Sequence, residues 1–163
     1  HTRIGFVVTH MVVTEVEGNF KDFEGSIVSK AADFNGAEIK FTAQTASIDT
    51  DHEKRNADLK SPTFFDAEKY PVITFTGTLV KDGGKYKLKG DFTMHGVTKA
   101  VEFDVTYGGS IETGRGTKAG FKLTGKINRR DYGLTWDAKV PTGELVVSET
   151  VEIVCKIEAD KKA

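Results

Sequence analysis

Apolar and polar residues alternate with a period of two along most of the chain. In residues 85–94, KYKLKGDFTM, the lysines, the aspartate and the threonine take one parity, while Tyr86, Leu88, Gly90, Phe92 and Met94 take the other. Successive side chains of a β-strand point to opposite faces of its sheet, so this pattern predicts a strand with one buried face.

The same alternation predicts five more strands, each with a set of inward-pointing apolar side chains. In chain order these sets are Ile39, Phe41 and Ala43; Ile73, Phe75 and Leu79; Val101, Phe103, Val105 and Tyr107; Phe121, Leu123 and Ile127; and Val151, Ile153, Cys155 and Ile157. Two less regular strands are expected over residues 2–16 and 18–29, and in the first of them His10 shares the phase of Phe6 and Val8. The predicted total is eight strands.

Residues typical of tight turns separate the expected strands. They are Asn35-Gly36, DGG at 82–84, His95-Gly96, the glycine-rich loop 108–116, and residues 141–143. Short connections make consecutive strands antiparallel neighbours. Three roles are open for His95, namely catalytic base, metal ligand and turn residue, and Gly96 favours the turn because glycine supplies the positive φ that a tight hairpin needs.

One segment, residues 47–71, breaks the alternation. Thr50 followed by Glu53 is typical of a capping box, which predicts a short surface helix over about residues 51–60. Phe64 and Phe65 then stand side by side in a polar stretch. Two adjacent aromatic residues in such a place indicate a plug that packs under the end of a barrel or the edge of a sandwich.

The predicted fold is all-β: an eight-stranded antiparallel barrel with a short helical insertion at about residues 50–70, formed by one domain spanning residues 1–163. Eight strands with one apolar face can form a sandwich or a barrel, and the interior of such a barrel either fills with side chains or holds one small ligand. Gly90, Gly125, Ala43 and Ala119 lie among the larger inward residues. This mixture of sizes favours a cavity lined by apolar side chains.

Composition and charge exclude several classes of partner. The 163 residues are 38% apolar and 29% charged, with a net charge of -1, so no electrostatic attraction to nucleic acid is expected. No apolar run approaches the ~18 residues that a membrane-spanning helix needs. Cys155 is the single cysteine, which excludes an internal disulfide. The strand-like pattern begins at once at His1 without a charged, apolar leader, so a segment upstream of His1 is an open expectation.

Candidate catalytic and metal-binding groups are few. The four histidines, His1, His10, His52 and His95, show no short metal-ligand spacing, and we predict neither a metal nor a cofactor. A small enzyme that uses His10 or His95 with Asp131 is the weakest of three hypotheses. Arg129, Arg130 and Asp131 form the most charged cluster beside an aromatic strand, and they are either a surface ion pair or a polar rim that meets the head group of a ligand.

Four groups of residues, in order, carry a resemblance to a known family. The opening HTRIGFVVTHMVVTEVEGNFKDFEG has His1, Phe6, His10, Gly18, Phe20 and Phe23 at the positions of a first strand pair. RNADLKSPTFFDAEKYPVITF follows as a helical insertion, HGVTK as a hairpin, and NRRDYGLTW as a late signature of arginine, Asp-aromatic-Gly-Leu and Trp. Over nearly the whole chain these motifs resemble the YceI-like family of lipocalin-like polyisoprenoid-binding proteins. Many members carry Asp and His where this chain has Asn56 and Asp58.

The resemblance implies a barrel whose pore holds an amphiphile with a long isoprenoid or acyl tail, in proteins that are often periplasmic or secreted and that catalyse no reaction. We therefore predict binding, storage or transport of a polyisoprenoid, an isoprenoid quinone or a fatty-acid-like lipid. A cytoplasmic location is the alternative, and a homodimer is an open expectation. The competing hypothesis is a filled β-barrel that acts as a protein-interaction or stress-response module without a lipid.

The predicted pore lining combines the inward phase of the strands with Trp136 of the late signature. It consists of Phe6, Val8, His10, Ile39, Phe41, Ile73, Phe75, Leu88, Phe92, Val101, Phe103, Phe121, Leu123, Trp136, Val151 and Ile153. Arg129, Arg130 and Asp131 are the predicted head-group rim.

Overall fold

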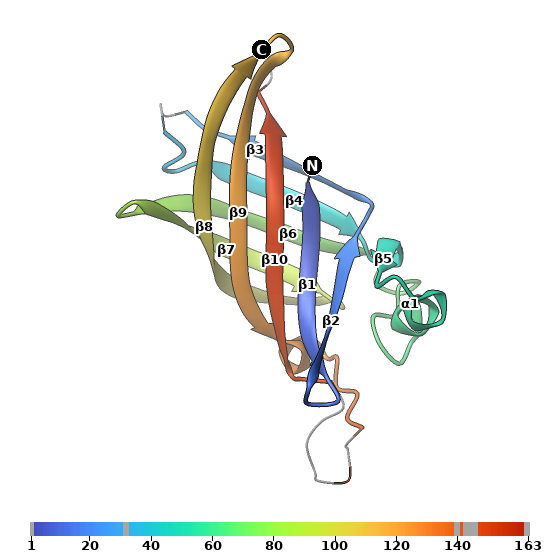
Figure 1. Ribbon diagram of the computed structural model, residues 1–163. Coiled ribbons are helices and arrows are strands. Elements are labelled where there is room, and N and C mark those ends of the chain that lie inside the picture. Colours follow the sequence, from blue (N-terminus) through green and yellow to red (C-terminus); the bar gives the residue numbers. More distant parts are fainter. Residues whose placement is uncertain (1, 31–32, 139–140, 142–146, 162–163) are drawn as a thin grey trace.

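The structure, a computed structural model, describes residues 2–30, 33–138, 141 and 147–161. The described residues form one antiparallel sheet that curls into a half-barrel (Figure 1). Its strands are β1 (Arg3–His10), β2 (Thr14–Phe20), β3 (Phe23–Val28), β4 (Glu38–Gln44), β5 (Ile48–Asp49), β6 (Val72–Asp82), β7 (Lys85–Met94), β8 (Val97–Thr113), β9 (Gly116–Asn128) and β10 (Thr150–Asp160). The all-β, barrel-like class predicted from the alternation is confirmed.

The strands follow the order β3-β4-β6-β7-β8-β9-β10-β1-β2-β5 across the sheet. Strands β6 to β10 therefore lie side by side in chain order, and the first two strands complete the curve beyond β10. Helix α1 (Glu53–Lys60) stands at one side of the curled sheet, next to β5 (Figure 1). Two short 3-10 turns, η1 (Thr45–Ser47) and η2 (Arg129–Tyr132), link strands.

The predicted number of strands is wrong: the described residues contain ten, not eight. The stretch 2–29 holds three strands rather than two, because the chain reverses at Met11 and Val12, which have positive φ values of 54° and 69°. Neither residue type signals a turn. The other additional strand is the two-residue β5, which pairs with the end of β2 and is too short to produce an alternation.

Where the alternation is regular, the predicted faces are correct. Strand β7 spans the ten residues of KYKLKGDFTM, and Tyr86, Leu88 and Met94 are buried. On β8, Phe103 is buried and Glu102 is exposed. The predicted loop at 108–116 is mostly strand, because β8 continues to Thr113 across a bulge between Tyr107 and Gly109. His1 and most of the turn predicted at 141–143 lie outside the described residues.

The turn assigned to His95 and Gly96 is confirmed. Met94 and Val97 are register partners, and the two residues between them have positive φ values of 54° and 73°. The His95 ring lies 4.5 Å from the Tyr70 ring, between centroids, and its Nδ1 is 2.9 Å from the carbonyl oxygen of Tyr132. The hairpin therefore connects the segment after α1 to η2.

One half of the sheet encloses a packed core rather than a space. An added Cβ at Gly125 would lie 2.1 Å from Cδ1 of Phe103, and one at Gly90 would lie 2.9 Å from Cζ of Phe75. The space beside Gly125 is filled by the Phe103 ring, and the space beside Gly90 by the β6 backbone at Thr76 and Gly77 together with the Phe75 ring. The inference that small inward residues mark a cavity is therefore wrong at both positions. Phe34 closes this half by packing against Phe121, at 5.1 Å between ring centroids.

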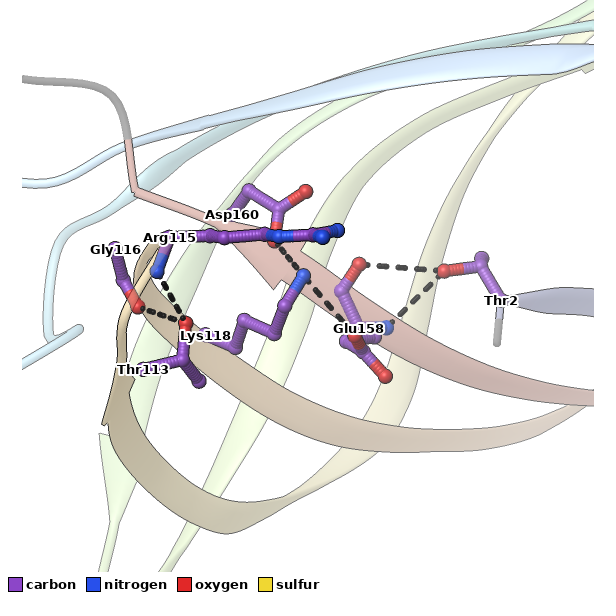
Figure 2. Close-up of polar contacts among 7 residues, drawn as sticks. All are labelled: Thr2, Thr113, Arg115, Gly116, Lys118, Glu158 and Asp160. Carbon is purple, nitrogen blue, oxygen red and sulfur yellow. Dashed lines mark hydrogen bonds and ion pairs between the residues drawn. The ribbon is translucent and has the colours of Figure 1, made fainter.

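Polar contacts hold the far end of the sheet, beyond the packed core. Figure 2 shows Lys118 of β9 between Asp160 and Glu158 of β10, with Nζ to carboxylate distances of 2.6 and 3.4 Å. The Thr2 hydroxyl donates to the carbonyl oxygen of Glu158 and accepts from its N–H, which joins the start of β1 to the same strand. These exposed ion pairs contribute little to stability, because water and salt screen them. No helix in the described ranges is long and apolar enough to cross a membrane.

Candidate functional site

A cavity of about 550 Å³ occupies the half of the barrel that the core leaves open. It lies where β6 begins, β7 and β9 end, and β10 begins, and Ile73, Met94, Ile127 and Val151 form its wall there. The inward face of β1 continues the wall through Ile4, Phe6, Val8 and His10. The volume falls within the range of ~300–1,000 Å³ that is usual for small-molecule sites.

A second hollow, of about 560 Å³, lies between β8, β9 and β10 near the tip of the β8–β9 hairpin. It is wide open to solvent, and its lining includes Lys118, Lys122, Lys156 and Glu158. An open, charged hollow of this kind buries little of a ligand, whereas the deeper and mainly apolar cavity has the shape to bury more of one. The cavity is therefore the candidate functional site.

The helical insertion closes one side of the cavity with aromatic side chains. Phe65 packs edge to face on Phe20 of β2, with ring centroids 6.3 Å apart, and Phe64 lies 5.4 Å from the Trp136 ring. Leu59 of α1 reaches the same wall. The plug predicted from Phe64 and Phe65 is confirmed, since both residues line the cavity.

Helix α1 is anchored by a polar network. The predicted capping box is wrong: the N-cap is His52, whose Nδ1 accepts from the N–H of Arg55. Thr50 is instead buried, and its N–H and hydroxyl both donate to Oδ1 of Asn56. Arg55 donates from Nε to the Thr50 hydroxyl and from NH2 to the Thr50 carbonyl, at 2.8 and 2.6 Å. Asn56 also donates to Oδ1 of Asp49 and thus holds the helix to β5.

Arg129 is a buried cation in the cavity wall. Its guanidinium donates to three carbonyl oxygens, those of Leu134, Val147 and Ser148, at 2.6 to 3.1 Å. Burial lowers the pKa of Arg129, and the charge of Arg130 lowers it further, but an arginine remains protonated in a protein. The nearby carboxylates of Asp137 and Glu149 pair with Arg130. The wall at Arg129 therefore carries a positive charge whose hydrogen bonds go to neutral groups.

The groups proposed for catalysis are not brought together. The His10 ring faces the cavity and makes no hydrogen bond with the described residues, while His95 is held in its turn by Tyr70 and Tyr132. Asp131 is exposed on η2, and no described hydrogen bond joins it to either histidine. Across the described ranges, no three His, Cys, Asp or Glu side chains cluster closely enough to hold a metal ion.

The predicted pore residues divide into two groups. Nine of them line the cavity: Phe6, Val8, His10, Phe41, Ile73, Phe92, Trp136, Val151 and Ile153. Seven lie away from it: Phe75, Leu88, Phe103, Phe121 and Leu123 belong to the buried core, and Ile39 and Val101 pack against that core. Of the predicted rim, Arg129 lines the cavity, and Arg130 and Asp131 do not.

Comparison with known proteins places the chain among its relatives. A family model described as the YceI-like domain matches residues 1–159. The chain belongs to this family. Among the relatives, a UPF0312 protein of Photorhabdus laumondii is 36% identical over 91% of this chain and 79% of its own length. Protein YceI of Escherichia coli O157:H7 is 33% identical over 93% of this chain and 81% of its own.

Solved structures of YceI proteins have the same fold. The crystal structure of the Campylobacter jejuni YceI protein matches with a TM-score of 0.82 and 32% identity, over 95% of this chain and 90% of that one. A polyisoprenoid binding domain from Saccharophagus degradans, implicated in plant cell wall breakdown, matches with a TM-score of 0.69 and 16% identity over 99% of this chain and 94% of that one. At that identity the second match shows the fold alone.

Sequence reasoning missed much of the wall of this YceI-like cavity. The lining residues that it did not name as ligand-binding are Ile4, Gly5, Val16, Phe20, Ala43, Thr50, Arg55, Asp58, Leu59, Thr63, Phe64, Phe65, Met94, Ile127, Leu134 and Val147. The paired aromatics Phe64 and Phe65 did signal a plug. Leu134 belongs to the late signature but was not assigned to the lining, and for Val147 no signal was available, because it lies in irregular chain without a period.

Proposed function

We propose that the chain binds a long-chain amphiphile, a polyisoprenoid, an isoprenoid quinone or a fatty-acid-like lipid, with its apolar tail in the cavity and without catalysing a reaction. The observation that carries this proposal is the cavity of about 550 Å³, enclosed by aromatic and aliphatic side chains, in a member of the YceI-like family. The same fold occurs in a polyisoprenoid binding domain, so this architecture is compatible with such a ligand. Burial of each methylene of the tail contributes about 0.8 kcal/mol.

The polar end of the ligand is proposed to lie near His10 and Arg129. His10 offers a ring nitrogen to the cavity, and the Arg129 charge favours a head group that carries negative charge or a strong acceptor oxygen. Arg130 and Asp131 have no direct part in this proposal, since neither lines the cavity. A quinone would need a single donor, whereas a phosphate or carboxylate would gain from the arginine as well.

Extraction tests the proposal directly. Protein purified from its own cells is denatured and extracted with organic solvent, and mass spectrometry should find a long-chain amphiphile in close to equimolar amount. Added isoprenoids or fatty acids should also change the emission of Trp136, the single tryptophan, which lines the cavity against Phe64. Extracts without lipid, together with unchanged emission and melting temperature on addition, would favour a protein-interaction module without a lipid ligand instead.

A pair of neighbouring substitutions on β1 separates cavity binding from general damage. Val8 lines the cavity, and Thr9 next to it is exposed. Val8→Asp places a carboxylate against the tail, and desolvating it should cost several kcal/mol, so affinity should fall at least about tenfold. Thr9→Asp is the matched control and should leave affinity within about twofold, because the added charge stays in water. Equal effects of the two variants would contradict the assignment of the cavity.

Location and oligomeric state remain predictions. The expected periplasmic or secreted location follows from the resemblance, and fractionation of cells that produce the natural protein would test it. The homodimer can be tested by light scattering with and without ligand.

A further inference from the structure

Three consecutive apolar side chains protrude at the turn between β1 and β2. Met11, Val12 and Val13 expose 47%, 48% and 84% of their surface. No charged residue lies between His10 and Thr14. Single exposed apolar residues are ordinary, but three in succession at the tip of a hairpin form a continuous apolar patch.

The backbone of this tip is unfavourable for the residues that form it. Met11 and Val12 have φ values of 54° and 69°, a left-handed conformation that is unusual for any residue other than glycine, asparagine or aspartate and most strained for a β-branched one. Asparagine and glycine would fit the turn with less strain. Since the side chains are exposed, packing within the folded chain does not account for their apolar character.

The tip stands directly beside the cavity. Val8 and His10, just before the turn, and Val16, just after it, all belong to the cavity wall. In Figure 1 the β1–β2 turn lies at the end of the sheet opposite the tip of the β8–β9 hairpin, and the chain that follows η2 lies at the same end. A surface that binds the tip would therefore lie next to the opening of the apolar cavity.

We infer that the tip of the β1–β2 hairpin, Met11 to Val13, inserts into the interface of a lipid bilayer and places the cavity against the membrane for exchange of its ligand. Three side chains are too few for a specific protein interface, which buries at least about 1,000 Å² in total. They suit shallow insertion, ~5–10 Å deep, at the boundary of head groups and acyl chains. The nearest charges on β2 are the acidic Glu15 and Glu17, so the surface should be zwitterionic rather than anionic.

The purpose of this docking rests on the proposed function, but the docking itself does not, and the two can fail separately. Association with vesicles is measured on ligand-free protein by flotation with phosphatidylcholine vesicles. Ligand binding is measured apart from membranes, with an isoprenoid or fatty acid delivered from detergent and followed by Trp136 emission. A tip that binds vesicles in a protein without affinity for lipid tails would leave the inference standing and contradict the proposed function.

The decisive variant replaces the tip by residues that suit its backbone: Met11→Asn, Val12→Gly and Val13→Thr together. We expect its partition coefficient on phosphatidylcholine vesicles to fall at least about tenfold, which corresponds to ~1.4 kcal/mol. Its melting temperature should rise, because the left-handed residues no longer carry a branched or long side chain. Ligand affinity in detergent should stay within about twofold. Weaker vesicle binding in a more stable protein cannot be attributed to unfolding.

Ile111→Gln is the matched control. Ile111 is 65% exposed near the tip of the β8–β9 hairpin, away from the cavity, and its replacement should not change vesicle binding. The inference is overturned if the native protein does not float with phosphatidylcholine vesicles, if it floats only with anionic ones, or if the triple variant floats as well as the native protein. Self-association by light scattering that the triple variant abolishes, without any vesicle binding, would assign the tip to a protein contact instead.

Discussion

The contact between Phe103 and Gly125 allows a test in which one substitution should repair another. Phe103 is 4% exposed, and its ring lies 6.1 Å from that of Phe75 and 6.4 Å from that of Phe92. An added Cβ at Gly125 would point into this ring, 2.1 Å from Cδ1. Gly125 does not have the left-handed φ that would strain a larger residue. A substitution there therefore changes stability through steric overlap with the Phe103 ring and not through backbone strain.

Each substitution alone should destabilise the protein. Phe103→Ala removes a buried ring and should lower the free energy of unfolding by about 3–5 kcal/mol. For a chain of this size that corresponds to roughly 6–20 °C in melting temperature. Gly125→Val forces a side chain into an occupied place and should cost about 1–3 kcal/mol. In the double variant the valine fills the space that the ring has left, so the loss should be smaller than the sum by more than the ~1–3 kcal/mol that Gly125→Val costs alone.

Urea denaturation of the four proteins, followed by Trp136 emission and by circular dichroism, measures this coupling. In the Phe103→Ala background, Gly125→Val should stabilise the protein, which is the reverse of its effect in the native background. Additivity within about 0.5 kcal/mol would refute the packed arrangement, because the ring and the valine would then not compete for the same space.

Three further predictions concern the rest of the chain. Burial raises the pKa of the Cys155 thiol to about 11, so this cysteine should resist a thiol reagent at pH 8 and react fully once the protein is unfolded. The pKa of Asp49 is lowered to about 2, mainly by its hydrogen bond with Lys21. The ionised carboxylate therefore stabilises the fold above the unfolded pKa of ~4, and this stabilisation is lost as pH falls to about 2. Asp49→Asn should accordingly flatten the acid side of the curve of melting temperature against pH. Gly96→Ala should cost about 1–3 kcal/mol in urea, because its Cβ would lie 2.5 Å from Cε1 of Tyr70 at a φ of 73°; an unchanged midpoint would argue against this contact.

The sequence was informative where one face of a strand is buried and the other is wet. Period-two alternation assigned Phe103 to the interior and Glu102 to solvent, and glycine beside His95 marked a hairpin with two positive φ values. The turn at Met11 and Val12 could not be recognised, because apolar residues in that conformation carry no turn signal. This is the same property that suggests a role for the tip.

The position of the cavity was less predictable than its chemistry. An inward phase tells that a side chain enters the barrel, but not whether a ring from a neighbouring strand already fills the space, as Phe103 does at Gly125. Likewise, the sequence pattern assigned both Arg129 and Arg130 to the head-group rim and did not distinguish between them. Only the fold distinguishes the arginine bound to carbonyl oxygens in the wall from the one paired with carboxylates outside it.

The His95 turn has a consequence for anyone who maps this site by mutagenesis. Its ring contacts Tyr70, which follows the aromatic plug in the chain, and the carbonyl of Tyr132, which follows Arg129 on η2. His95, which lies outside the cavity, thus contacts two segments that are distant in sequence and that each adjoin a part of the cavity wall. A change at His95 should disturb both contacts, so a loss of ligand affinity in such a variant is no evidence that His95 touches the ligand.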